Sequence, residues 1–148
     1  MTKFTFRLES ILSIKLKLEE QAKMEFGAAK MKLSEEQDKL EELYNKKSGY
    51  ENDLKRLYSE DLDIKRINGT ARAIEIVDEQ IKLQKYAVKR AEKQVDLATQ
   101  KLNTVMQERK SMEKLKEKRF AEYMREYNEE ESKQTDELIS YQYGRVEE

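Results

Sequence analysis

Apolar residues recur along the chain at the alternating three- and four-residue spacing of a coiled-coil seam. In the first half, this seam of inward a and d positions runs from Thr5 to Ile64. Its apolar members are Leu8, Leu12, Ala22, Phe26, Ala29, Leu33, Leu40, Leu43, Tyr50, Leu54, Leu57 and Ile64. Its polar exceptions are Thr5, Lys15, Glu19, Glu36, Lys47 and Asp61. The spacing predicts one long helix over about residues 5–66.

The second half of the chain repeats the pattern. Its apolar seam positions are Ile74, Val77, Ile81, Val88, Ala91, Val95, Ala98, Leu102, Val105 and Met112. Gln84 and Arg109 interrupt this seam, and beyond Met112 the apolar stripe drifts around the helix. The spacing predicts a second helix over about residues 72–140, followed by a frayed tail to residue 148.

The strongest turn signal of the chain lies between the two predicted helices. Asn68 and Gly69 can adopt positive φ and end a helix, and the Thr70 hydroxyl can cap the next one. A turn over residues 67–71 makes the helices antiparallel, and residues whose numbers add to 138 then face each other. Registers shifted by seven residues match equally well, so only the shortness of the turn favours this one. The expected fold is all-α: a single domain over residues 1–148, with two long helices in an antiparallel coiled-coil hairpin.

Composition supports helix and excludes most enzyme chemistry. The 148 residues include no proline and four glycines, and charged residues of both signs make up 41% with a formal net charge of -1. The chain has no cysteine and no histidine, so the commonest nucleophile, general base and metal ligands are missing. A two-helix seam also offers no concave pocket for a small molecule. We therefore expect no catalytic residues, no metal, no cofactor and no direct small-molecule ligand.

Two further features concern location and charge. No apolar run is long enough for a membrane span and the N-terminus lacks a secretory h-region, so a cytoplasmic location is expected. Residues 109–119 are rich in lysine and arginine, whereas residues 122–148 are predominantly acidic. Residues 109–119 contain no aromatic side chain that could stack on a nucleic-acid base, and the whole chain is slightly acidic. No nucleic-acid partner is therefore expected.

Two stretches resemble a known family. Phe6-Arg7-Leu8-Glu9 is followed by Leu12 and Lys15 near the N-terminus. Arg109-Lys110 and the run from Glu113 to Lys118 are followed by Tyr123, Lys133 and Asp136-Glu137. In length, two-helix organisation and the order of these sites, the chain is similar to the FliJ family of the flagellar type III export apparatus.

The resemblance implies a cytoplasmic, non-enzymatic component held peripherally at the cytoplasmic face of the membrane. The hairpin would be similar to the central stalk subunit of rotary ATPases and would bind the flagellar export ATPase ring. It would couple that ring to the export gate membrane protein and to substrate chaperones. No Gly-rich phosphate loop is present, so ATP hydrolysis would belong to the partner.

The resemblance also suggests contact residues. Those implied for the ATPase ring are Arg109, Lys110, Lys114, Lys116, Lys118, Asp136 and Glu137. Those implied for the export gate are Ala73, Val77, Gln80 and Gln84, although Val77 and Gln84 are also seam positions. Two other hypotheses fit the pattern of residues: a structural coiled-coil spacer or dimerisation module, and a nucleic-acid-binding helical arm.

Overall fold

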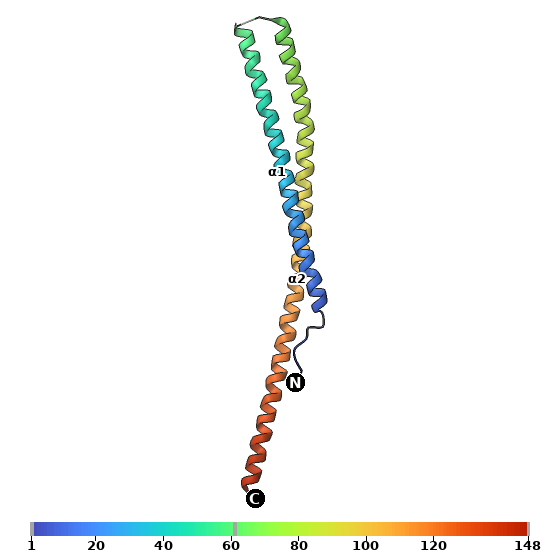
Figure 1. Ribbon diagram of the computed structural model, residues 1–148, viewed down its shortest axis with the longest axis vertical. Helices are drawn as coiled ribbons and strands as arrows, with labels where there is room; N and C mark the ends of the chain where they lie inside the picture. Colours follow the sequence, from blue (N-terminus) through green and yellow to red (C-terminus); the bar gives the residue numbers. More distant parts are fainter. Residues whose placement is uncertain (1, 61, 148) are drawn as a thin grey trace. The chain divides into compact units, whose positions relative to one another are not determined.

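The computed structural model describes residues 2–60 and 62–147, with side chains up to residue 145. Helix α1 spans Glu9–Glu60 and helix α2 spans Ile64–Glu147. Residues 2–8 precede α1 without helical structure, and the described residues contain no strand. The two helices pack against each other in opposite directions (Figure 1), which confirms the predicted all-α hairpin.

The chain divides into two compact units, each built from both helices. The central unit is Gln21–Asn103, and the terminal unit combines Met1–Glu20 with Thr104–Glu148. The central unit therefore holds the connection between the helices, and the terminal unit holds both ends of the chain.

The predicted seam is the interior of each unit. Val77, Ile81, Val88 and Ala91 of α2 are buried in the central unit, and Leu12 of α1 is buried in the terminal unit. All the other assigned seam positions over 8–57 and 74–112 are buried or half-buried. Of the remaining assigned positions, Thr5 and Ile64 are exposed and Asp61 lies outside the described residues. The heptad pattern thus identified the core because a side chain every 3.5 residues faces the partner helix.

The connection between the helices is centred seven residues earlier than the sequence pattern indicates. Residues 67–71 are not a turn but belong to α2, because α1 ends at Glu60 and α2 begins at Ile64. The Asp63 carboxylate accepts a hydrogen bond of 3.1 Å from the Lys65 backbone N–H, and the Asp63 carbonyl accepts one of 3.0 Å from Ile67. Asp63 is therefore the N-cap of α2, a signal that the stronger Asn-Gly turn pattern obscured.

The register follows from this connection. In the central unit, Lys47 pairs with Asp78 and Lys101 pairs with Glu25, and their residue numbers add to 125 and 126. The nearest value at which seam positions face seam positions is 124, which differs from the predicted 138 by 14. The predicted register is therefore wrong by two heptads. A shift of two heptads keeps every a and d position in the seam. The prediction of which residues lie in the seam was therefore correct, whereas the prediction of which residues face each other was wrong.

The C-terminal part of α2 is also longer than expected. The helix continues to Glu147 without the predicted frayed tail after residue 140. Within the terminal unit, the red end of α2 continues past the N-terminal segment (Figure 1), and residues 128–145 are all exposed. We call residues 128–147 the overhang. It contains no proline, and half of its residues are good helix formers, led by glutamate, so a helix that no partner helix covers is permitted there.

Candidate partner-binding surfaces

The basic stretch in the terminal unit separates into an inward and an outward set. Arg109 and Lys116 are half-buried and pair across the seam with Glu19 and Glu9, respectively. Lys110, Lys114 and Lys118 are exposed. The structure therefore places Arg109 within the seam and pairs Lys116 with Glu9 at its solvent-exposed edge, and it leaves Lys110, Lys114 and Lys118 on the surface.

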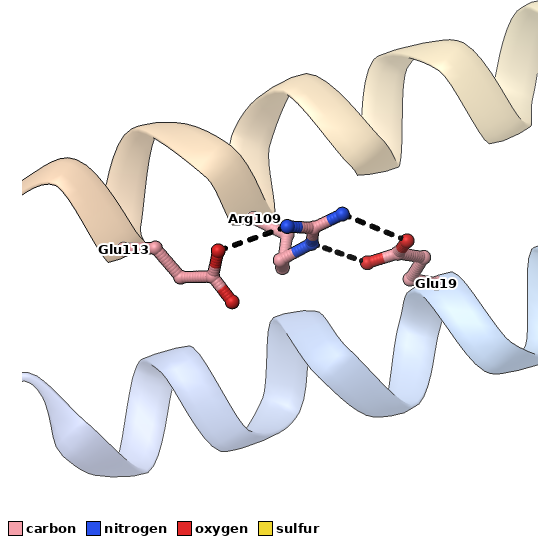
Figure 2. A network of polar contacts seen from close by, with 3 residues as sticks. All are labelled: Glu19, Arg109 and Glu113. Carbon is pink, nitrogen blue, oxygen red and sulfur yellow. Dashed lines mark hydrogen bonds and ion pairs between the residues drawn. The ribbon is translucent and has the colours of Figure 1, made fainter.

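Arg109 is held by two carboxylates (Figure 2). Its Nε and Nη2 donate hydrogen bonds of 2.6 and 3.1 Å to the two oxygens of Glu19, and its Nη1 donates one of 2.9 Å to Glu113. Glu19 is only 5% exposed, so a bidentate guanidinium–carboxylate pair lies within the seam. These carboxylates, Glu19 first, raise the pKa of Arg109 and keep its charge fixed.

The three exposed lysines form one line on α2. Lys110, Lys114 and Lys118 are four residues apart, a spacing that places side chains along one helix face. We call these three residues the lysine stripe. A line of cations on one helical face can attract an acidic surface of another protein without disturbing the seam.

An aromatic cluster joins the N-terminal segment to α2 in the terminal unit. The Phe4 ring lies 5.2 Å from Phe120 and 5.4 Å from Tyr123, measured between centroids. The Tyr123 hydroxyl donates a hydrogen bond of 2.8 Å to the Thr2 carbonyl. The register of 138 would have placed Phe4 near Gln134, so its packing on Phe120 shows the same two-heptad correction as the central unit.

The overhang carries the remaining predicted ring-contact residues. Asp136 and Glu137 are exposed there. Large apolar side chains are exposed beside them: Leu138, Ile139, Tyr141 and Tyr143. Exposed aromatic and aliphatic groups next to charges are typical of surfaces that other proteins cover.

The residues suggested for the export gate do not share one surface. Val77 is 2% exposed and lies in the core of the central unit, and Ala73 is half-buried. Gln80 is exposed, whereas Gln84 turns inward. The seam assignment thus holds for Val77 and Gln84, and only Gln80 presents its side chain freely to a partner.

A shallow groove surrounds Gln80 and the edge of Gln84. It lies between the two helices of the central unit and is lined by Lys39, Glu42, Leu43, Lys46, Gln80, Leu83 and Gln84. Leu83 is 68% exposed although it is fully apolar. The sequence analysis assigned Leu43 to the seam and named none of Lys39, Lys46 and Leu83 as a partner contact. The available signal was the apolar type of Leu83 at a position just outside the seam.

Beneath this groove, Gln84 contacts a second carboxylate of the seam. The Gln84 side-chain amide donates to the Glu36 carboxylate and, at 2.9 Å, to the Glu36 backbone carbonyl. Glu36 is 7% exposed and also pairs with Lys32 at 2.9 Å. Lys32, followed by the Gln84 amide, lowers the pKa of Glu36 to about 2. Glu36 and Gln84, one polar interruption from each predicted seam, therefore satisfy each other.

Comparison with known proteins completes these observations. A family model described as flagellar FliJ protein matches residues 4–148. Searches of curated proteins and of solved structures found no significant match. In the part of the chain that the structure describes, no helix combines the length and the apolar content needed to cross a bilayer.

Proposed function

The chain belongs to the flagellar FliJ family, whose model matches nearly its whole length, and we propose that it binds the flagellar export ATPase as a non-enzymatic stalk. Family membership makes it a component of the flagellar export apparatus. The stalk role would place the terminal unit in the ATPase ring, at the cytoplasmic face of the membrane. The single observation that carries this proposal is the presence of the lysine stripe and the uncovered overhang in that one unit.

The contact set is narrower than the resemblance implies. Arg109 and Lys116 already have carboxylate partners inside the terminal unit, so a partner protein would have to break those pairs to use them. The lysine stripe is exposed and would contact acidic residues of the ring. Asp136 and Glu137 would contribute from the overhang.

We further propose that the groove of the central unit contacts the export gate. The support is the combination of exposed Gln80, exposed Leu83 and two lysines at its border, Lys39 and Lys46. An apolar centre with a polar rim is the usual anatomy of a protein interface. Substrate chaperones complete the proposed partners, without a contact surface assigned to them.

The stalk role is tested by steady-state ATP hydrolysis of the cognate flagellar export ATPase with and without the chain. The test variant reverses the lysine stripe by Lys110→Glu, Lys114→Glu and Lys118→Glu. We expect stimulation to fall about tenfold or more, because like charges would then face each other at the interface. Circular dichroism checks that the variant remains helical.

A matched control separates the site from a general charge effect. Lys82→Glu, Lys89→Glu and Lys93→Glu make the same charge change at three exposed lysines of the central unit. This control should stimulate the ATPase like the unmodified chain. Equal stimulation by the stripe variant, or no stimulation by the unmodified chain, would reject the proposed contact and favour a spacer function.

A further inference from the structure

Gly69 is of a residue type that favours turns, but in the observed fold it lies within a helix. It lies near the start of α2, and no described residue, glycines included, has positive φ. A Cβ atom built at Gly69 would meet no atom within 4 Å, so no close approach requires glycine there. Glycine destabilises a helix interior relative to alanine, and Asn68-Gly69 therefore fits a turn better than the helix it occupies.

A turn at Asn68-Gly69 would produce a different hairpin with the same apolar seam. Centring the turn on Gly69 moves the register from about 124 to 138, which is two heptads. Leu43 would then face Val95 in place of Ile81, and all three are seam residues. Apolar packing alone hardly separates two registers that place the same kinds of side chains in the same layers.

The polar seam pairs do separate them. In the observed register, Glu19 meets Arg109 (Figure 2) and Glu36 meets Gln84. The residue numbers of these pairs add to 128 and 120, which is four above and four below 124. At the same offsets in the register of 138, Arg109 would reach Leu33 and Glu36 would reach Ala98. Glu36 would keep Lys32 and Arg109 would keep Glu113, because these pairs lie within one helix, but both would lose the partner on the facing helix. Loss of a buried hydrogen-bonded partner is costly, so the alternative register is penalised at both sites.

We propose that the Glu19–Arg109 and Glu36–Gln84 pairs select the register of the hairpin against a competing register two heptads away, whose turn lies at Asn68-Gly69. The pairs act within different units, one in the terminal unit and one in the central unit. Each places a polar side chain of α1 and one of α2 at seam positions, and polar seam residues of this kind specify register in coiled coils. This inference concerns the fold and does not depend on the proposed partners.

The test uses pairs of introduced cysteines. Because the natural sequence contains no cysteine, the introduced pair supplies the only thiols. Leu43→Cys with Ile81→Cys reports the observed register, and Leu43→Cys with Val95→Cys reports the competing one. A disulfide needs Cα atoms within about 7 Å, whereas 14 residues of helix span about 21 Å. Each pair therefore reports one register. Oxidation is measured at low protein concentration, and monomers are separated on a non-reducing gel.

Each reporter is placed in the unmodified background and in a variant with four leucines at Glu19, Glu36, Gln84 and Arg109. In the unmodified background, we expect the 43/95 disulfide to form at least about tenfold more slowly than the 43/81 disulfide. In the four-leucine variant, the 43/95 disulfide should form about tenfold faster than before. Adding Gly69→Ala to that variant should slow it again, because alanine favours helix over the competing turn.

The matched control makes the same residue-type changes to leucine at exposed sites, namely Glu20, Glu35, Arg90 and Gln94. It should retain the unmodified pattern. The proposal is overturned if the helical four-leucine variant still forms only the 43/81 disulfide, if the control gains the 43/95 disulfide to the same extent, or if both disulfides form equally fast in the unmodified background.

Discussion

At the scale of single residues, the polar interruptions of the seam carry more information than the apolar residues around them. Glu36 and Gln84 were identified from the sequence only as defects in two heptad patterns. In the structure they bond to each other, and Glu19 and Arg109 do the same. Pairing these four interruptions would have indicated the observed register, because the residue numbers of the two pairs add to 120 and 128, on either side of 124 and well below 138.

The depressed pKa of Glu36 predicts a pH dependence of stability. Its pKa is about 2 in the folded chain and 4.5 ordinarily, so the ionised group stabilises the fold above about pH 4.5. That contribution is lost as the pH falls toward 2. Thermal unfolding followed by circular dichroism should therefore show a smaller loss of stability between pH 5 and pH 2 for Glu36→Gln than for the unmodified chain.

The comparison has an internal control at an exposed carboxylate. Glu35→Gln removes the neighbouring acidic group outside the seam, and Glu35 is exposed. This variant should keep the full pH dependence attributed to Glu36. Identical pH profiles for Glu36→Gln and the unmodified chain would show that the contacts of Glu36 with Lys32 and Gln84 do not affect stability.

At the scale of elements, each helix has an interior face set by the heptads and an outer face that the heptads do not describe. Leu83 and Leu97 of α2 are both exposed, at the same heptad position and 14 residues apart. Only Leu83 lies in the groove with Lys39 and Lys46. Outer residues of the same type therefore differ in their surroundings, which depend on the facing helix.

This difference gives the proposed gate contact a matched test. Gln80→Ala with Leu83→Ser should lower binding to the purified export gate protein about tenfold or more, because the two exposed side chains that α2 contributes to the groove are lost. Gln94→Ala with Leu97→Ser makes the same changes two heptads along α2. Surface plasmon resonance measures both. Equal losses, or none in the groove variant, would remove the groove from the interface.

At the scale of the whole molecule, the candidate binding surfaces lie in two different units, and each unit contains parts of both helices. The central unit contains the connection and the groove, and the terminal unit contains the lysine stripe, the aromatic cluster and the overhang. In the terminal unit, Phe4 packs on Phe120, whereas the side chains of residues 128–145 are exposed. The overhang is thus available to a partner and contributes little to folding.

Truncation tests this division. Removing residues 130–148 should change the thermal midpoint by less than about 2 °C, since the described side chains there are exposed. The same truncation should abolish stimulation of the export ATPase. Removing residues 1–5 should instead lower the thermal midpoint, because Phe4 is lost from the aromatic cluster. Full stimulation by the C-terminal truncation would exclude the overhang from the ATPase contact.

The two helices and their buried faces were determined by the sequence alone, because helix periodicity and the alternation of apolar and polar side chains are local properties of the chain. The lysines at 110, 114, 116 and 118 were also visible there as candidates. The tertiary structure decided which of these lysines is left without a partner on the other helix, since Lys116 forms an ion pair with Glu9 of α1. The register was decided in the same way. Apolar layers repeat every seven residues, so they do not fix the register, and turn chemistry favoured Gly69. The observed register instead satisfies two polar pairs, Glu36–Gln84 and Glu19–Arg109, whose members are 48 and 90 positions apart in sequence.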